Sequence, residues 1–252
     1  MKRKGIFLMC MLIATTCMNC NVKAAEESKN GFTYDTKYNN ASWTKMEKIT
    51  VKSKKNGKLG TLSYLTGVTR RKGTDDYIVM FKEVMTPNNK KVTLDNAKSK
   101  GYGLSEYCSL KTTLPTLDDY KPQNSPKTDS VNVGIGASKK AGPQVSATYT
   151  IKNSELDITS NCSTPKKEYR IVYDYKPHIP NALGNNKYLA NESIQLGTAQ
   201  FHSSKKTVSF KVNYDARFGA ACDKERSPWH VQIGYVKRKT GSREYSFTVK
   251  KK

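Results

Sequence analysis

Apolar and polar residues alternate with a period of two along several segments of this chain. In residues 207–214 every second position from Val208 to Tyr214 is apolar, and polar residues occupy the positions between them. Residues 168–176 and 229–236 repeat this pattern with aliphatic and aromatic side chains. A period of two places one set of side chains on each face of a strand. The pattern predicts antiparallel sheets, each with one face in a core and the other in water.

Turn signals divide the N-terminal half into strands. Asn56-Gly57 separates residues 48–53 from residues 59–68, which predicts a hairpin. Lys72-Gly73-Thr74 then separates this second strand from a continuous apolar run, Tyr77–Phe81. A strand that is apolar at every position is expected to be buried on both faces, so this run is predicted to be a central strand.

The C-terminal half carries a similar signal, and helix-type spacing is missing throughout. Residues 239–242, Lys-Thr-Gly-Ser, are predicted to turn the 229–236 strand into a last strand at 245–249. No window of a dozen residues after residue 24 has apolar positions at i, i+3, i+4 and i+7. The expected fold is all-β, an antiparallel β-sandwich of one large or two small β-units, with little helix apart from a signal peptide.

A shift in composition suggests where the chain divides. Residues 113–130 hold Pro115, Pro122 and Pro126 with few apolar side chains, as in a linker or a long loop. A single sandwich with a long crossover at this place is the alternative. The expected organisation is a signal peptide at 1–24, an N-terminal arm at 25–45, an N-terminal β-unit at 46–112, a Pro-containing linker at 113–130 and a C-terminal β-sandwich unit at 131–252.

The N-terminus has the layout of a secretory signal. Three basic residues at positions 2–4 precede a largely apolar stretch at 5–16, and Val22 and Ala24 suit the positions that a signal peptidase reads. The apolar stretch is too short for a membrane-spanning helix, which needs about 20 residues. Lipid anchoring through Cys17 or Cys20 fits less well. We therefore expect a secreted, extracellular protein that is cut after Ala24.

Cysteine usage limits the disulfides and metal sites that can form. Cys108, Cys162 and Cys222 remain after the signal is removed, so two of these three can form one disulfide and one thiol is left over. The pairing is open. The mature chain has no CxxC or HxxxH pair, which argues against a zinc site, and no cofactor motif is present.

Motifs of known catalytic sites are also missing. The chain has three histidines, His178, His202 and His230, and each has a local sequence that fits an ordinary surface position. No nucleophile elbow, phosphate-binding loop or metalloprotease helix occurs. A thiol nucleophile at Cys108 paired with a distant histidine would rest on residue types alone. We therefore expect a protein that is not an enzyme and has no cofactor or catalytic metal.

The excess of basic residues indicates an anionic partner. Removing residues 1–24 takes away four basic residues and no acidic one, so the formal charge falls from +23 to +19. Such a field accelerates encounters with lipid headgroups, wall polymers, acidic glycans or an acidic partner protein. No nucleic-acid module is visible, so nucleic acid is not the expected partner. The candidates for anion binding are Arg70, Arg71, Lys72, Lys237, Arg238, Lys239, Arg243, Lys250, Lys251 and Lys252.

Residues 131–151 form a pattern of their own. Apolar residues occupy every second position from Val131 and again from Val145 to Ile151, and small, uncharged residues lie between them. A polar turn at 139–143 is predicted to join the two arms. The pattern fits a sandwich hairpin with one face in the core. It also resembles, in strand alternation and export, secreted β-barrel pore formers. The expected function is binding to an anionic surface or a partner protein, and the alternative is a membrane-damaging toxin that inserts these residues.

Overall fold

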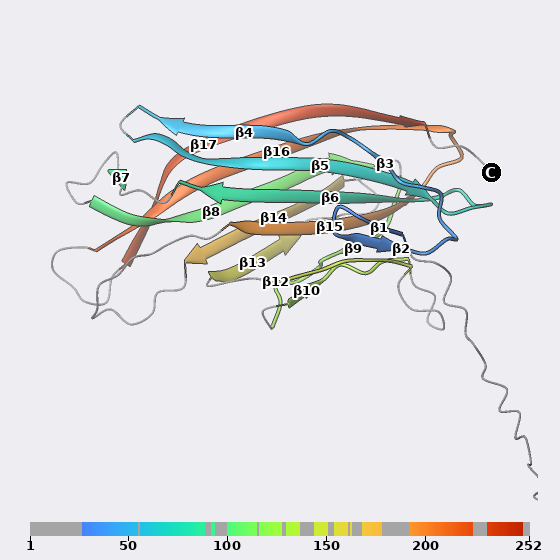
Figure 1. The fold of residues 1–252 in the computed structure, drawn as a ribbon, viewed down its shortest axis with the longest axis horizontal. Coiled ribbons are helices and arrows are strands. Elements are labelled where there is room, and N and C mark those ends of the chain that lie inside the picture. Colours follow the sequence, from blue (N-terminus) through green and yellow to red (C-terminus); the bar gives the residue numbers. More distant parts are fainter. Residues whose placement is uncertain are drawn as a thin grey trace, which may run out of the picture.

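The fold consists of long antiparallel strands that run along the longest axis of the molecule (Figure 1). A computed structural model of the chain describes residues 27–54, 56–88, 92–93, 100–114, 116–127, 130–136, 144–150, 154–160, 162, 168–177, 192–223 and 231–248. These residues form strands and connections without any α-helix, which confirms the all-β class. No helix in this part of the chain is long and apolar enough to cross a membrane.

Two six-stranded sheets pack face to face as a sandwich. We call them the inner sheet, with the order β3-β5-β6-β15-β9 and β4 beside β5, and the outer sheet, with the order β13-β14-β8-β16-β17 and β7 beside β8. The inner strands are β3 (Ser42–Trp43), β4 (Glu47–Ser53), β5 (Gly57–Arg70), β6 (Asp76–Pro87), β9 (Leu117–Lys121) and β15 (Ser193–His202). The outer strands are β7 (Val92–Thr93), β8 (Lys100–Thr113), β13 (Ser154–Ser160), β14 (Glu168–Pro177), β16 (Thr207–Asp223) and β17 (Val231–Thr248).

Aromatic side chains fill the space between the two sheets. The rings of Tyr64 and Tyr214 stack with their centroids 3.8 Å apart, and the Tyr214 hydroxyl shares a 2.8 Å hydrogen bond with Thr66 Oγ1. Phe218 of the outer sheet lies against Gly60 of the inner sheet, where an added Cβ would be 2.3 Å from the Phe218 ring. A side chain at position 60 would therefore displace this ring from the core.

A third layer covers the other face of the inner sheet. It contains a three-stranded sheet of β1 (Glu27–Lys29), β2 (Phe32–Tyr34) and β11 (Val145–Ser146), and a separate pair, β10 (Ser130–Asn132) and β12 (Thr148–Thr150). Trp43 packs on this face against Gly67, 2.6 Å from where a Cβ would stand. Because both faces of the inner sheet are covered, all residues of β5 from Leu62 to Arg70 are buried. The prediction that Tyr77–Phe81 is a central strand buried on both faces is confirmed for the same reason.

The period-two predictions agree with the structure where side chains are described. Val208, Phe210, Val212 and Tyr214 are buried in β16, and Ser209 and Lys211 between them are exposed. The hairpin at Asn56-Gly57 is confirmed by the pairing of β4 with β5, and Gly57 has a φ of +66°. Left-handed backbone at this turn favours glycine because glycine lacks a Cβ.

The predicted C-terminal hairpin is wrong. Strand β17 continues through residues 239–242 without a turn, and each of these residues pairs with a residue of β16. Lys239 pairs with Ala216, and Gly241 pairs with Tyr214. The ladder of hydrogen bonds to a long neighbouring strand outweighs the local turn preference of Lys-Thr-Gly-Ser. The connection between β16 and β17 falls at residues 224–230, outside the described part of the chain.

The two large sheets interleave segments from both ends of the chain. Strand β15 lies between β6 and β9 of the inner sheet, and β8 lies between β14 and β16 of the outer sheet. The Pro-containing residues 113–130 contribute β9, and residues 25–45 contribute β1, β2 and β3 with Phe32 and Tyr34 buried. Strands from the two predicted β-units therefore pair with each other within each large sheet. The signal peptide lies outside the described residues.

Candidate functional site

The third layer contains the two-stranded unit that the sequence predicted at residues 131–151. We call residues 130–136 and 144–150 the ribbon. Ser130 pairs with Thr150 and Asn132 with Thr148 in the antiparallel register of β10 and β12. The pairing continues beyond these strands, because Val133 N donates to Ala147 O at 2.9 Å. The predicted ribbon is therefore confirmed, and residues 137–143 and Ile151 lie outside the described part of the chain.

The ribbon has one apolar face and one polar, uncharged face. The apolar row lies against the inner sheet and is buried. The polar row is turned outward, and none of the fourteen described residues of the ribbon is charged. The buried row is Val131, Val133, Ile135, Val145, Ala147 and Tyr149. The exposed or half-buried row is Ser130, Asn132, Gly134, Ser146, Thr148 and Thr150.

The ribbon belongs to neither six-stranded sheet, and it is attached to the body at a few described places. Thr198 Oγ1 of β15 donates to Val133 O at 2.9 Å. The backbone N–H of Asp35 donates to Gln144 O, also at 2.9 Å. In addition β11 pairs with β2 over two residues on each strand, where Thr33 lies opposite Ser146. Hydrophobic burial therefore contributes more to docking than hydrogen bonds do, since the described backbone links are few.

One end of the ribbon meets Tyr38 of the N-terminal segment. Gly136 has a φ of +76°, and an added Cβ there would lie 2.8 Å from the Tyr38 hydroxyl. Tyr38 is buried, and this burial raises its pKa to about 12 although the charge of Arg71 acts in the opposite direction. The neutral phenol is therefore the form that packs beside the ribbon at ordinary pH.

The N-terminal segment holds the ribbon, which the sequence pattern did not predict. Asn30 and Gly31, with φ of 56° and 93°, form the turn between β1 and β2. This Asn-Gly pair is a strong hairpin signal, and Phe32 and Tyr34 follow it at alternate positions. A reading of residues 27–34 as a hairpin was therefore available from the sequence. The sequence contains no signal that this hairpin pairs with residues 145–146.

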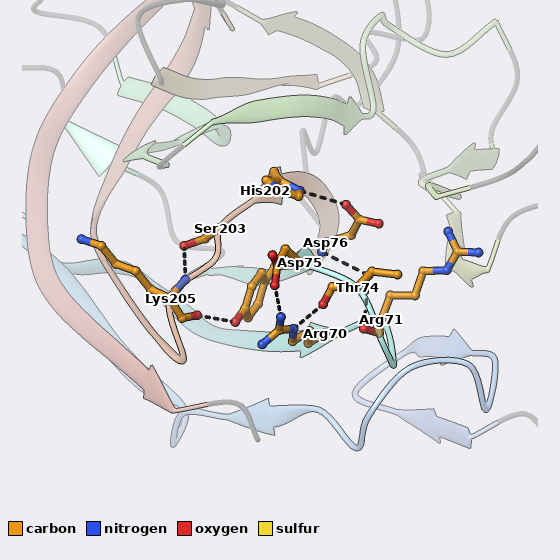
Figure 2. A network of polar contacts seen from close by, with 9 residues as sticks. Arg70, Arg71, Thr74, Asp75, Asp76, His202, Ser203 and Lys205 are labelled. Atoms are coloured by element: carbon orange, nitrogen blue, oxygen red, sulfur yellow. Dashed lines mark hydrogen bonds and ion pairs between the residues drawn. The ribbon is translucent and has the colours of Figure 1, made fainter. Parts of the chain in front are cut away.

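The basic residues proposed as anion binders are not all at the surface. Figure 2 shows Arg70 inside a polar network at the turn between β5 and β6. Its Nη2 donates to Asp75 Oδ1, its Nε donates to Thr74 O at 2.6 Å, and its guanidinium lies 5.1 Å from the centre of the Tyr77 ring. Tyr77 in turn donates to Lys205 O at 2.7 Å. Arg70 is buried and stabilises this turn.

The neighbours of Arg70 differ from it because they lie beyond the end of β5, at the turn between β5 and β6. Arg71 is half-buried and Lys72 is exposed. Lys237, Arg238, Lys239 and Arg243 lie in the part of β17, residues 231–243, where only the backbone is described, and Lys250, Lys251 and Lys252 fall outside the described residues. Anion binding at these positions stays a prediction.

The candidate catalytic residues do not form a described cluster. His202 is exposed, and its Nδ1 lies 3.2 Å from Asp76 Oδ1. His178 and His230 lie outside the described residues. Nearby, burial raises the pKa of the Asp118 carboxyl, and the charge of His202 partly offsets this effect. Among the described residues, His202 and Asp76 are thus a polar pair at the surface.

Cys108, Cys162 and Cys222 lie on or beside the outer sheet. Cys162 Sγ donates a weak hydrogen bond to Arg170 O at 3.6 Å. Cys108 lies opposite Ala216 on one side and Tyr173 on the other, and Cys222 lies opposite Gln232. A disulfide between two of them stays a prediction that a thiol count tests.

Comparison with known proteins gives a likeness of fold only. No family model matches the sequence, and no curated protein matches it either. Among solved structures, Clostridium perfringens delta-toxin is similar with a TM-score of 0.44 and 9% identity, covering 89% of this chain and 96% of the toxin. A structure described as a pore forming protein has a TM-score of 0.46 and 9% identity, covering 88% of this chain and 95% of the other. The likeness is weak in both cases, and at this identity no residue role can be carried across.

Proposed function

We propose that this chain is an exported membrane-damaging protein that inserts its ribbon into a lipid bilayer. The observation that carries the proposal is the ribbon itself. It has a continuous apolar row, an uncharged polar row and a position outside both large sheets. The proposal needs no catalytic step and no cofactor.

The two faces of the ribbon match what a membrane-spanning strand requires. Such a strand turns one row of side chains to lipid and the other to water. In the docked position the apolar row is kept from water by the inner sheet, and lipid would keep it from water equally well. A polar row of Ser, Asn and Thr can line a water-filled lumen without placing a charge there, so the charges that insertion has to carry across are those of the connecting turn, Lys139 and Lys140.

The length of the ribbon also bears on insertion. Each described arm has seven residues, Ser130–Gly136 and Gln144–Thr150, and a spanning strand needs about 9–11. Insertion would therefore have to extend each arm into its flanking sequence, including Ala137 and Ile151. Copies of the chain would have to pair their inserted ribbons, since unpaired backbone groups are costly in hydrocarbon.

A disulfide that holds the ribbon in place tests the proposal. Thr33 and Ser146 are half-buried register partners of β2 and β11, and paired residues on adjacent strands are about 4.5–5.5 Å apart at Cα, within disulfide range. In the Thr33→Cys/Ser146→Cys variant, we expect dye release from anionic vesicles to fall to the rate of vesicles alone. Reduction of the disulfide should restore release.

The control is a disulfide that leaves the ribbon unconstrained. Ser209 and Ser246 are exposed register partners on β16 and β17, with their hydroxyls 2.8 Å apart. The Ser209→Cys/Ser246→Cys variant should release dye at the wild-type rate in both redox states. If the oxidised ribbon-locked variant also released dye at that rate, insertion of the ribbon would be excluded.

A second candidate function is binding to an anionic surface or an acidic partner without insertion. The observation that favours it is the formal charge of +23, or +19 after the expected signal cleavage, together with exposed lysines such as Lys52, Lys58 and Lys211. Lipid headgroups, wall polymers and acidic glycans share the required chemistry. Vesicle binding without dye release, equal in the wild type and the ribbon-locked variant, would favour this second function.

A further inference from the structure

A polar pocket lies where the ribbon leaves the body of the protein. It has a volume of about 270 Å³ and lies between residues 121–127, which begin at the last residue of β9, and the first strand of the ribbon. Its lining residues are Lys121, Pro122, Gln123, Asn124, Pro126, Lys127, Ser130, Val131 and Asn132. The body and the ribbon thus each contribute one wall.

The wall contributed by the body is held in place by the outer sheet. Ser125 Oγ accepts a hydrogen bond from Ile158 N at 2.8 Å, and Ser160 Oγ donates to Gln123 O at 3.1 Å. Both partners belong to β13. Pro122 is buried, which fixes the start of the same wall. This side of the pocket is therefore formed before any ligand arrives, so binding there needs little ordering of the chain.

The lining composition favours an anion. It includes two lysines and the side-chain amides of Gln123, Asn124 and Asn132, with no acidic and no aromatic residue. Lys127 is exposed. A sugar site would be expected to offer an aromatic face, and a cation site would offer carboxylates. Lysine ammonium groups with amide donors are the groups that bind phosphate oxygens.

A described carboxylate beside the lining, Asp119, only partly offsets this charge. Its Oδ1 lies 4.0 Å from Lys121 Nζ and accepts a 3.3 Å hydrogen bond from Gln123 Nε2. Asp119 is not among the lining residues, and both members of the Lys121 pair are more than a third exposed to solvent. A long, exposed ion pair of this kind contributes little, so Lys121 can turn toward a ligand at small cost.

We propose that this pocket binds a phosphate-bearing anion of the size of a lipid headgroup. The volume is slightly below the roughly 300–1,000 Å³ of sites for drug-sized ligands, which suits a phosphate with a short polar substituent. Asn132 Oδ1 accepts a 2.7 Å hydrogen bond from Gly134 N, so the NH₂ of the same amide is the group left to donate to the ligand. Lys121 and Lys127 supply the charge.

Binding at this place also couples to the position of the ribbon. A ligand that touches both walls binds more tightly when the ribbon is docked, so it shifts the population toward the docked state. A soluble phosphate compound should therefore slow dye release. This coupling rests on the proposed function, whereas the binding itself does not and is measured separately.

The experiment is a titration of the full-length mature protein with glycerol 3-phosphate, followed by amide chemical shifts. We expect the shifts to concentrate in residues 121–132. The variant Lys121→Gln/Lys127→Gln should weaken binding by about tenfold or more, because it removes two charge-assisted contacts. The matched control is Lys52→Gln/Lys58→Gln, which removes the same charge from an exposed pair of register partners on β4 and β5. It should change the affinity by less than about twofold.

Vesicles containing phosphatidylglycerol then identify the source of the phosphate. If the headgroup is the ligand, the pocket variant binds these vesicles more weakly than the control variant does. If a free phosphate compound is the ligand, the two variants bind vesicles equally and the pocket variant alone loses glycerol 3-phosphate binding. Equal losses of glycerol 3-phosphate binding in both variants, or shifts scattered over the surface without residues 121–132, would overturn the site. If the wild type bound glycerol 3-phosphate but released no dye from vesicles, that result would count against the proposed function and leave the phosphate site standing.

Discussion

Tyr169 is fully buried between the two large sheets, and its hydroxyl has no hydrogen-bond partner among the described residues. Its ring stacks on Phe81 with centroids 5.3 Å apart. Tyr214 is equally buried, but its hydroxyl bonds to Thr66 Oγ1. Comparing the two tyrosines therefore distinguishes the free-energy cost of burying a phenol hydroxyl from the stabilisation that its hydrogen bond provides.

We predict opposite effects of removing these two hydroxyls at neutral pH. Tyr169→Phe should leave the free energy of unfolding unchanged or raise it by up to about 1 kcal/mol, because a desolvated hydroxyl is removed. Tyr214→Phe should lower it by about 1 kcal/mol, because Thr66 loses its partner. Urea unfolding at pH 7 measures both.

Tyr169→Phe should also change how the free energy of unfolding depends on pH above pH 10. Burial raises the pKa of Tyr169 well above its ordinary value of 10. The unfolded chain therefore loses this proton first, near pH 10, so ionisation of the unfolded chain lowers the free energy of unfolding as the pH rises above 10. Tyr169→Phe should make that fall shallower. The prediction would be contradicted if the free energy of unfolding of the variant fell as steeply above pH 10 as that of the wild type and was lower at pH 7. The hydroxyl would then have a favourable role in the fold.

Residue-scale detail is also where sequence analysis reached least far. Arg70, Arg71 and Lys72 form one basic run, but Arg70 is the buried last residue of β5 and Lys72 is exposed in the turn that follows. Asp75, five residues after Arg70, is a common turn residue, and the sequence does not show that it neutralises a buried guanidinium. A charge run therefore predicted a surface patch where one member belongs to the core.

At the scale of strands, periodicity predicted the elements better than their neighbours. The faces of β16 and of the ribbon followed from alternation alone, because a period of two fixes which side chains share a face. Alternation did not predict that β17 continues past residue 241, because this continuation depends on pairing with β16, which the pattern of either strand alone does not show. The pairing of β2 with β11 has the same cause, since it joins residues more than a hundred positions apart.

Docking of the ribbon can be weakened at one glycine. In Gly136→Ala the new methyl group meets the Tyr38 hydroxyl, and the left-handed backbone is also strained. We expect the free energy of unfolding to fall by about 1–2 kcal/mol. The amides of Ile135 and Val145, which form backbone hydrogen bonds across the ribbon, should exchange their hydrogens faster.

Gly57→Ala is the matched control, because Gly57 has a similar φ of +66° and nothing lies within 4 Å of an added Cβ. Gly57→Ala should lower the free energy of unfolding by about 1 kcal/mol through backbone strain, and hydrogen exchange at the ribbon amides should stay at the wild-type rate. Equal exchange at Ile135 in the two variants would show that Tyr38 does not restrain this end of the ribbon.

The whole molecule combines a sandwich, a separately attached third layer and a large positive charge. The sandwich and the third layer were partly predictable. Alternation predicts which residues form strands, but it does not predict which layer each strand joins. The charge follows from the sequence alone and acts over about 8–10 Å at physiological salt, where ions screen it. It can bring the protein to an anionic membrane, but a screened attraction cannot keep it there at high salt.

This difference separates attachment by charge from insertion. Protein bound to anionic vesicles at about 50 mM salt should stay bound when salt is raised to about 1 M only if the apolar row of the ribbon has entered lipid, because the screening length then falls to about 3 Å. We predict that the wild type stays bound and that the oxidised Thr33→Cys/Ser146→Cys variant washes off. Co-sedimentation with vesicles before and after the salt step measures both. Release of the wild type would favour the surface-binding function, and retention of the locked variant would place the apolar contact in another part of the protein.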